Sequence, residues 1–271
     1  MKKLKKIIKS KKKNLLILVL ILAIILGINY PICKLKVSVI TFYNNIGPQA
    51  AIVIDDFGNN GEGTEKMLTE IKAPLTCAIM PFMPYSKEEA KLAHSLGHEV
   101  IIHLPMQPHT GNPKWLGEKG ITTDLSTDEI KSILREAIEE VPFAVGLNNH
   151  MGSKATEDLR IMTAIIEVLK EHNMYIVDSR TSSKSVVEEV AKAHGVSVRT
   201  RDVFIDNNKD YNSIKNQLQQ LKDLAMENGK AIGIGHVGPE GGTVTAKGIK
   251  DMIHEFENKG VKIVPVSELL E

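Results

Sequence analysis

The sequence predicts an α/β fold, a (β/α) barrel in which parallel strands alternate with covering helices. From residue 50 onward, eight apolar runs of strand length recur along the chain, and amphipathic stretches separate most of them. Seven or eight such units in roughly 220 residues fit one barrel better than two domains. An open, doubly wound sheet is the alternative, but the polar residues that end the strands favour the barrel. The apolar runs cover residues 50–54, 75–80, 100–102, 144–147, 174–177, 196–198, 231–234 and 261–264.

Helical stretches are marked by capping residues and by apolar spacing. Ser126 and Glu129 form a capping-box pair, and apolar residues follow at intervals of three and four. A glycine comes after several helical stretches, just before the next apolar run, where a left-handed residue commonly ends a helix. These signals place helices between most of the predicted strands. The glycines are Gly97, Gly195, Gly229 and Gly260.

The charge distribution argues against a nucleic-acid partner. The chain has 271 residues, with 34 Lys and Arg against 33 Asp and Glu and a net charge of +1. Eight lysines lie within residues 1–13, which contain no acid, and subtracting these eight charges leaves −7 for the rest. Neutralising phosphates needs a basic face, and the only dense basic block is this terminal one. We therefore expect no nucleic-acid partner.

An apolar segment follows the basic block. Residues 15–26 are twelve apolar residues without a break, a length between a secretory signal core and a full membrane span. No small-residue cleavage site follows, which favours an uncleaved signal anchor over residues 14–32 above a cleaved signal peptide. By the positive-inside rule, residues 1–13 form a cytoplasmic tail, and a linker at 33–48 leads to an extracytoplasmic domain at 49–271. We expect a single-pass protein of the cell membrane; the alternative is secretion after cleavage.

Five of the apolar runs end in residues that can bind a metal or transfer protons. In a parallel barrel, the carboxyl ends of all strands open onto one face, so these residues are expected to converge there. One such residue alone means little, because Asp often caps a helix and His often packs in a core. The joint pattern predicts the site. The residues are Asp55, Asp56, His103, Asn148, Asn149, His150, Asp178 and His236.

Asp56, His103 and His150 are the candidate metal ligands. Two imidazoles and one carboxylate hold a catalytic divalent metal and leave a position open for water; zinc is the expected ion, and manganese, cobalt or nickel would fit the same ligands. Asp55 is the candidate for the base that takes a proton. Consecutive strand residues point to opposite faces, so both carboxylates reach one site only if the strand has ended, and Gly58 permits such a turn. The alternative is that Asp55 caps a helix.

Five short motifs, in order, resemble those of the divergent polysaccharide deacetylase family, a branch of the metal-dependent deacetylases with a NodB-type barrel. The resemblance covers the chain from about residue 50 onward. It implies a distorted barrel of seven or eight strands, and it implies hydrolysis of N- or O-acetyl groups on an acetylated glycan of the cell envelope or outside the cell. The motifs are residues 54–58, 103–106, 149–153, 177–181 and 234–236.

The resemblance also implies roles for individual residues. Asp55 would be the general base, and the three candidate ligands would hold the metal. His236 would be the general acid that protonates the leaving amine. Asp178 would raise the pKa of His236, because a nearby carboxylate favours the imidazolium.

Two departures from the wider deacetylase superfamily leave alternatives open. The main family takes both metal histidines from one H-x-x-x-H stretch, but Gln107 stands four residues after His103. His150 then supplies the third ligand, or Gln107 or His109 replaces it, or metal binding is weak. A catalytically silent glycan-binding protein on the same barrel is the alternative function, and a peptide or phosphoester substrate is a third. The wider family also holds its base with an arginine, for which the candidates are Arg180, Arg199 and Arg201.

The long loop at residues 104–125 contains several Pro and Gly residues and the only tryptophan, Trp115. Loops at the carboxyl face of a barrel carry specificity, and an exposed indole suits the stacking of a sugar ring. The alternative is that Trp115 packs the loop onto the barrel. The candidates for substrate contacts are Trp115, Arg180 and Arg201.

Overall fold

Strand β1 (Gln49–Phe57) lies inside the sheet, and all but one of its residues are buried. The computed structural model describes residues 47–270. β1 pairs in parallel with β2 (Thr76–Ile79) on one side and with β8 (Lys230–His236) on the other. A parallel sheet is covered on both faces, which is why these strands read as nearly continuous apolar runs.

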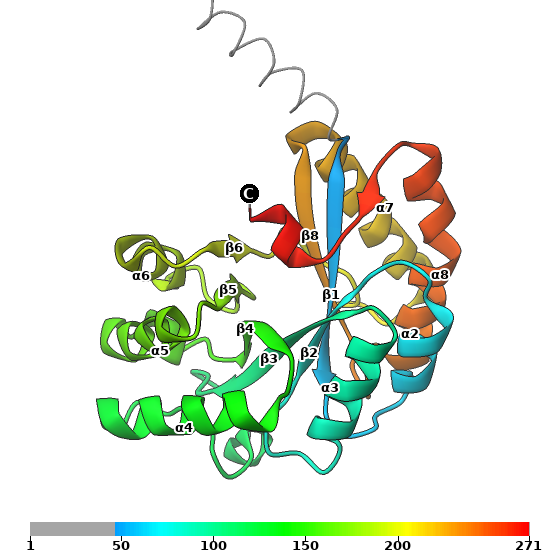
Figure 1. Cartoon of the computed structure of the whole chain (residues 1–271). Coiled ribbons are helices and arrows are strands. Elements are labelled where there is room, and N and C mark those ends of the chain that lie inside the picture. The colour runs from blue at the N-terminus through cyan, green and yellow to red at the C-terminus, as the bar shows by residue number, and fades with distance from the viewer. Residues whose placement is uncertain (1–46, 271) are drawn as a thin grey trace, which may run out of the picture. The chain divides into compact units, whose positions relative to one another are not determined.

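Every strand pair in this part of the chain is parallel, and the sheet follows the order β6-β5-β4-β3-β2-β1-β8-β7. From β1 to β6, strands that follow one another in sequence are neighbours in space, as in a (β/α) barrel. The sheet curls, and helices lie along its outer side (Figure 1). The prediction of a parallel sheet with covering helices is confirmed. The remaining strands of this order are β3 (Glu99–Met106), β4 (Ala144–Met151), β5 (Tyr175–Asp178), β6 (Val198–Thr200) and β7 (Val203–Phe204).

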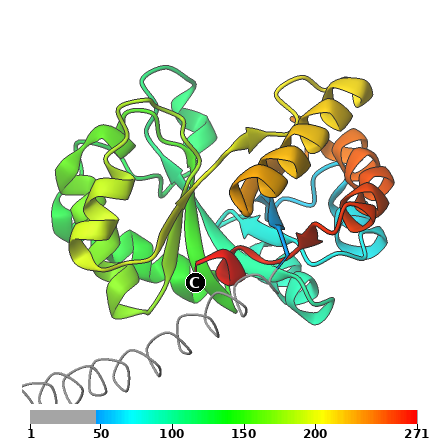
Figure 2. The same ribbon diagram turned by 90° about the horizontal axis from the view of Figure 1, so that it is seen from above.

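The curled sheet is open, because no ladder within residues 47–270 pairs β6 with β7. These two edges belong to one extended stretch of chain that pairs first with β5 and then with β8. Between them, Arg201 donates its backbone N–H to the backbone oxygen of Asp178, and Asp202 donates its backbone N–H to the backbone oxygen of Ile232. In Figure 2 this stretch crosses from the green half of the fold to the orange half. One crossing segment thus spans the gap that a closed barrel would fill with a further strand.

The last predicted strand lies outside the main strand order and pairs with the sheet at one point only. β9 (Lys262–Ile263) is two residues long and pairs only with the beginning of β1. Pro265 follows closely and lacks the N–H that a longer ladder needs. The chain then forms a short 3₁₀ helix, η3 (Val266–Leu269).

The predicted helix signals are confirmed where α4 (Thr127–Glu140) begins. Ser126 Oγ accepts the backbone N–H of Glu129, and the Glu129 carboxylate accepts the backbone N–H of Ser126. The predicted glycine ends are also present, since Gly195 and Gly229 follow their helices with left-handed φ angles of 72° and 80°. The other α-helices of the described chain are α2 (Thr64–Glu70), α3 (Ser86–Ser95), α5 (Leu159–Glu171), α6 (Val187–His194), α7 (Tyr211–Asn228) and α8 (Gly242–Asn258).

Alternate residues of each strand face two different cores. One core lies between the sheet and the helices, and the other fills the interior of the curled sheet. In β1, Ala51 and Val53 face the interior, so the same alternation directs Asp55 to the interior at the carboxyl end of the strand. The strand residues of the interior core are Ala51, Val53, Ala78, Ile101, Tyr175, Val177, Ile232 and Ile234.

The predicted cytoplasmic tail and signal anchor lie outside the described residues, as does the predicted linker apart from residues 47 and 48. Within residues 47–270, no helix has the length and apolar character needed to cross a membrane.

Candidate active site

The carboxyl ends of four strands, β1, β3, β4 and β8, meet at a cavity of about 1020 Å³. Five of the residues predicted to act in metal binding or catalysis line this cavity. They come from distant parts of the sequence, and the parallel sheet brings them to one face. These residues are Asp55, Asp56, His103, His150 and His236.

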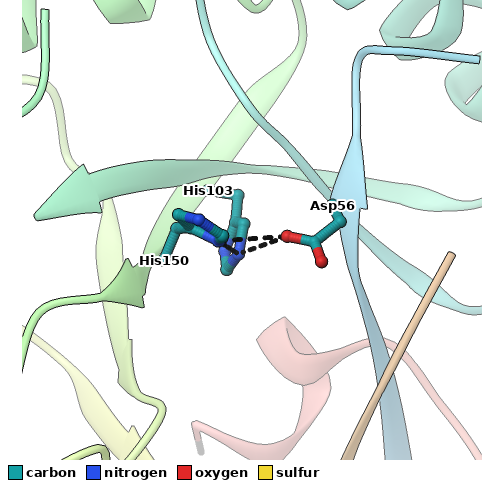
Figure 3. A group of neighbouring side chains, drawn as sticks. All are labelled: Asp56, His103 and His150. Atoms are coloured by element: carbon teal, nitrogen blue, oxygen red, sulfur yellow. Dashed lines mark hydrogen bonds and ion pairs between the residues drawn. The ribbon is translucent and has the colours of Figure 1, made fainter. Parts of the chain in front are cut away.

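Asp56, His103 and His150 form a tight cluster (Figure 3). Asp56 Oδ1 lies 3.3 Å from His103 Nε2 and 3.1 Å from His150 Nδ1. The two ring nitrogens are 3.1 Å apart. Pro105 of β3 is the register partner of His150, and His103 is two residues before it, so both imidazoles project from the same side of the sheet. The structure therefore brings the three predicted ligands together.

Asp56 reaches the cavity through a bulge, which corrects the prediction that the strand has ended. β1 continues to Phe57, but its pairing with β2 shifts register between Ile54 and Phe57. Asp56 has a left-handed φ of 69°, a conformation that costs about 1–3 kcal/mol for a residue other than glycine. A bulge places two consecutive side chains on one face. Asp55 and Asp56 thus both line the cavity.

Glu89 of α3 fixes the backbone directly after the bulge. Its Oε2 accepts the backbone N–H of Gly58 at 2.6 Å, and its Oε1 accepts that of Asn60 at 2.6 Å. Burial raises the pKa of Glu89, and these two hydrogen bonds work against that rise. Because no motif contains Glu89, the sequence analysis missed this contact.

The side chains present fit a divalent metal. Asp56 Oδ1 is buried and has no hydrogen-bond partner in the described part of the chain, although two ring nitrogens lie beside it. A bound cation satisfies a buried carboxylate oxygen of this kind. Burial raises the pKa of Asp56, but His103 and His150 outweigh it and hold that pKa far below its usual value. Two imidazole nitrogens and one carboxylate oxygen suit zinc, and also manganese, cobalt or nickel.

Asn148 links the metal cluster to Asp55. Its Oδ1 lies 2.7 Å from His103 Nδ1, and its Nδ2 donates a 2.7 Å hydrogen bond to Asp55 Oδ1. Because the amide NH₂ faces a carboxylate, the amide oxygen faces His103 and accepts from Nδ1, which leaves Nε2 as the nitrogen able to bind a metal. The sequence placed Asn148 at a strand end without giving it a role.

Asp55 is buried, with 2% of its surface exposed, and burial raises its pKa. Within residues 47–270 no arginine lies within ion-pair distance of its carboxylate, so the expected arginine partner is replaced by Asn148. Arg199, one of the candidates, instead donates to the backbone oxygen of Leu269. Arg201 lines the cavity, and the negative charge of Asp55 raises the pKa of Arg201 although the two side chains form no ion pair. The helix-cap alternative for Asp55 does not apply, because the residue lies within β1.

His236 is the register partner of Asp55 on the neighbouring strand, and its Nε2 lies 4.0 Å from Asp55 Oδ2. Its other ring nitrogen, Nδ1, lies 2.8 Å from Asp206 Oδ1. Asp206 Oδ2 accepts hydrogen bonds from the backbone N–H of His236 and from Thr245 Oγ1. Burial lowers the pKa of His236, but the hydrogen bond to Asp206 and the charge of Asp55 outweigh it and raise the pKa to about 9.

Asp206, and not Asp178, is therefore the carboxylate that contacts His236, which corrects the sequence prediction. Val177 faces the interior core, so Asp178 directly after it is out of phase with the cavity. The Asp178 carboxylate accepts the backbone N–H of Arg180 at 2.7 Å. Asp206 lies two residues after the two-residue strand β7, at the end of the short apolar stretch 203–205.

The two alternatives for the third metal ligand are occupied elsewhere. Gln107 Oε1 accepts hydrogen bonds from the backbone N–H and the hydroxyl of Thr123. His109 is 53% exposed and lies 3.0 Å from the carboxylate of Glu157. The cluster therefore takes its third member from His150 on β4.

Trp115 lies on the short 3₁₀ helix η1 (Pro113–Leu116) in the loop after β3. Its side chain is 58% exposed and lines the cavity together with Phe82 and Met83. This exposure matches the sugar-platform interpretation better than packing onto the barrel. Arg180 and Arg201, the other candidates for substrate contacts, line the same cavity.

The chain is similar to known proteins along most of its length. Residues 52–270 match the family model of divergent polysaccharide deacetylases. The chain is 37% identical over 220 residues to the uncharacterized protein YibQ of Escherichia coli, covering 81% of this chain and 66% of that protein. It is 31% identical over 211 residues to an uncharacterized protein of Haemophilus influenzae, covering 78% of this chain and 74% of that one.

The fold is also similar to a solved structure. The crystal structure of an uncharacterized protein from Agrobacterium tumefaciens superposes with a TM-score of 0.77 at 21% identity. The match covers 82% of this chain and 89% of that one. At this identity the likeness supports the fold alone.

Proposed function

Because the chain belongs to the divergent polysaccharide deacetylase family, we propose that it is a metal-dependent hydrolase that removes acetyl groups from a glycan. The observation that carries this proposal is the metal-type cluster of Asp56, His103 and His150, with Asp55 and His236 on the same cavity. A bound divalent metal, for which we propose zinc, would polarise the acetyl carbonyl and lower the pKa of water.

The other two residues transfer protons in the proposed reaction. Asp55 takes a proton from the attacking water through Oδ2, while Asn148 holds its Oδ1. The bond between the acetyl carbon and the glycan nitrogen or oxygen then breaks, and His236 Nε2 donates a proton to the leaving atom. His236 carries this proton at neutral pH, since its pKa is about 9. The products are acetate and the free amine or hydroxyl.

We further propose that the substrate is a glycan of the cell envelope. The support is the N-terminal sequence, in which a lysine block precedes a long apolar run. The positive-inside rule would then place the domain outside the cytoplasm and close to the membrane.

Metal content and acetate release, measured on the same preparations, test the proposal. Full-length protein is purified in a non-ionic detergent without chelator or affinity metal, and acetate release is assayed on N-acetylated chito-oligosaccharides and O-acetylated xylan. We expect about one equivalent of metal. Asp56→Ala should lose both metal and activity, whereas Asp55→Asn should keep the metal and lose activity. Asp128→Asn, an exposed residue on α4, is the matched control and should change neither.

Two results would contradict the proposal in different ways. Metal that stays bound to Asp56→Ala would refute the ligand assignment. A wild-type protein that binds metal and acetylated glycan but releases no acetate would instead support the alternative, a catalytically silent glycan-binding protein. Screening peptide and phosphoester substrates on the same preparations tests the third alternative, a hydrolase that acts on a peptide or a phosphoester.

A further inference from the structure

Arg180 and Arg201 are adjacent on the wall of the cavity that holds the metal-type cluster. Arg201 Nη2 lies 3.4 Å from the backbone oxygen of Arg180. Within residues 47–270, neither guanidinium has a carboxylate within ion-pair distance. Arg135, by contrast, pairs with Glu171 at 2.8 Å on the outer helices. The wall of the cavity therefore carries two neighbouring cations that form no direct ion pair, although Asp55, Asp56, Glu118 and Glu240 line the same cavity.

Arg201 is held in a fixed position. Its Nε donates a 2.8 Å hydrogen bond to the backbone oxygen of Ser179, and its guanidinium lies 4.9 Å from the centre of the Phe204 ring. These contacts use one edge and one face of the planar group and leave further N–H donors free. A guanidinium that is already oriented loses little freedom when it binds a ligand.

The backbone of Arg180 is fixed as well. Its N–H donates to the Asp178 carboxylate, and its φ is a left-handed 51°. The preceding residue, Ser179, makes two hydrogen bonds to Asn149, the residue directly before the ligand His150. Strained backbone that is held this firmly is concentrated at functional sites. The loop thus positions Arg180 with respect to the metal cluster.

The electrostatics of this pair favour an anionic ligand. Burial and the like charge of Arg180 lower the pKa of Arg201 more than the charges of Asp55 and Asp178 raise it, yet a guanidinium stays protonated in proteins. Arg201 is half-buried and Arg180 is exposed; two adjacent cations repel one another, and a bound anion relieves this repulsion. The planar forks of arginine match the oxygens of carboxylates and phosphates.

We propose that Arg180 and Arg201 form an anion-binding subsite, and that the glycan substrate carries a carboxylate or phosphate group close to the acetylated sugar. The inference rests on the proposed function for its substrate class. The subsite itself is defined by binding, which can be measured without turnover.

Two matched pairs of sugars test the proposal and distinguish the two anions. N-acetylglucosamine 1-phosphate is compared with N-acetylglucosamine, and a hyaluronan tetrasaccharide, which carries carboxylates, is compared with neutral chitotetraose. Binding to the full-length protein in detergent is followed by the fluorescence of Trp115, the only tryptophan, which lines the same cavity. We expect the anionic member of at least one pair to bind about tenfold more tightly than its neutral partner.

The arginine variants then test whether Arg180 and Arg201 cause the tighter binding of the anionic sugar. Arg180→Gln and Arg201→Gln should each reduce this preference to about twofold or less, by weakening the binding of the anionic sugar more than that of the neutral sugar. Arg135→Gln, on the outer helices, is the matched control and should retain the full preference. Arg180 is exposed, so its substitution should not affect folding; for the half-buried Arg201, Arg201→Lys keeps the charge and should retain part of the preference.

The proposal would be overturned by equal binding of anionic and neutral sugars to the wild type. It would also be overturned by a preference that survives both glutamine variants, because the anion would then bind at the metal cluster. Asp56→Ala separates this inference from the proposed function: the variant should release no acetate, yet it should still prefer the anionic sugar.

Discussion

Asp206 binds His236 at two points: Oδ1 lies 2.8 Å from the ring Nδ1, and Oδ2 accepts the backbone N–H at 2.7 Å. The carboxylate therefore fixes both the position of the histidine and the orientation of its ring. It also leaves Nε2 directed toward Asp55, 4.0 Å away. A histidine held in this way can present a proton to the cavity at neutral pH.

Replacing Asp206 should lower the pKa of His236. The wild-type pKa is about 9, and Asp206→Asn removes the negative charge that raises it. The midpoint of the His236 ring titration, followed by NMR, should move down toward 6.5, the ordinary value. If the protein is active, the alkaline decline of kcat/KM should move to lower pH with it.

Asp178→Asn is the matched control for this prediction and should leave the His236 titration unchanged.

The contribution of Asp206 to the free energy of unfolding should also depend on pH, because the protonation of His236 differs between the folded and unfolded states. Because the folded-state pKa of His236 is raised, the stabilisation that comes from the charge of Asp206 on the His236 ring is complete below about 6.5 and is lost as pH rises through about 9. A difference in unfolding free energy between wild type and Asp206→Asn that grows above pH 9 would contradict this assignment.

Strand alternation accounts for most of the site that the sequence predicted. Asp55, His103 and His236 each lie two residues after an apolar residue of the interior core, on the same strand. Asp178 comes directly after Val177 of that core and so is out of phase. Because residues 174–177 are all apolar, the sequence does not show which face each of them takes, and only the structure excludes Asp178.

Asp206 also follows an apolar stretch, residues 203–205, but its pairing with His236 could not be predicted in the same way. Phe204 is the register partner of Ile234, and Asp206 and His236 each follow two residues later. This register exists only because the chain crosses the gap between the two edges of the sheet. A two-residue strand carries no periodicity that would reveal the crossing. The bulge at Asp56 is equally invisible, because a left-handed aspartate has no sequence signature.

Removing the Asn148 amide should weaken metal binding. Asn148→Ala leaves His103 without the partner that orients its ring, and it leaves Asp55 without a hydrogen bond. Loss of a residue that orients a metal ligand typically costs about 10–100-fold in affinity. Competition with a chromogenic zinc chelator measures this change. Asn212→Ala, exposed on α7, is the control; equal affinities for both variants would refute the orienting role.

Glu89→Ala should affect both stability and metal affinity. The substitution leaves the backbone N–H groups of Gly58 and Asn60 without their acceptor, which costs about 1–3 kcal/mol for a buried donor. It also frees the backbone next to Asp56, so metal affinity should fall. The neighbouring residue Glu88 is exposed on the same helix, and Glu88→Ala should change neither urea unfolding nor zinc affinity. A loss of stability without a loss of metal affinity would limit Glu89 to a structural role.

Trp115→Ala should weaken glycan binding and leave the metal site intact. The indole is 58% exposed and lines the cavity. Aromatic contacts of this kind contribute about 0.5–1.5 kcal/mol, so the dissociation constant for chitotetraose, measured by calorimetry, should rise about twofold to tenfold. Zinc affinity and thermal unfolding should stay at their wild-type values.

Phe143→Ala is the matched control for Trp115→Ala. Phe143 is 52% exposed and stacks on His94 before the amino end of β4, away from the cavity. Its loss should not change the affinity for chitotetraose. Unchanged affinity in Trp115→Ala would remove the indole from the binding site, whereas a fall in its unfolding temperature would revive the interpretation that Trp115 packs the loop onto the barrel.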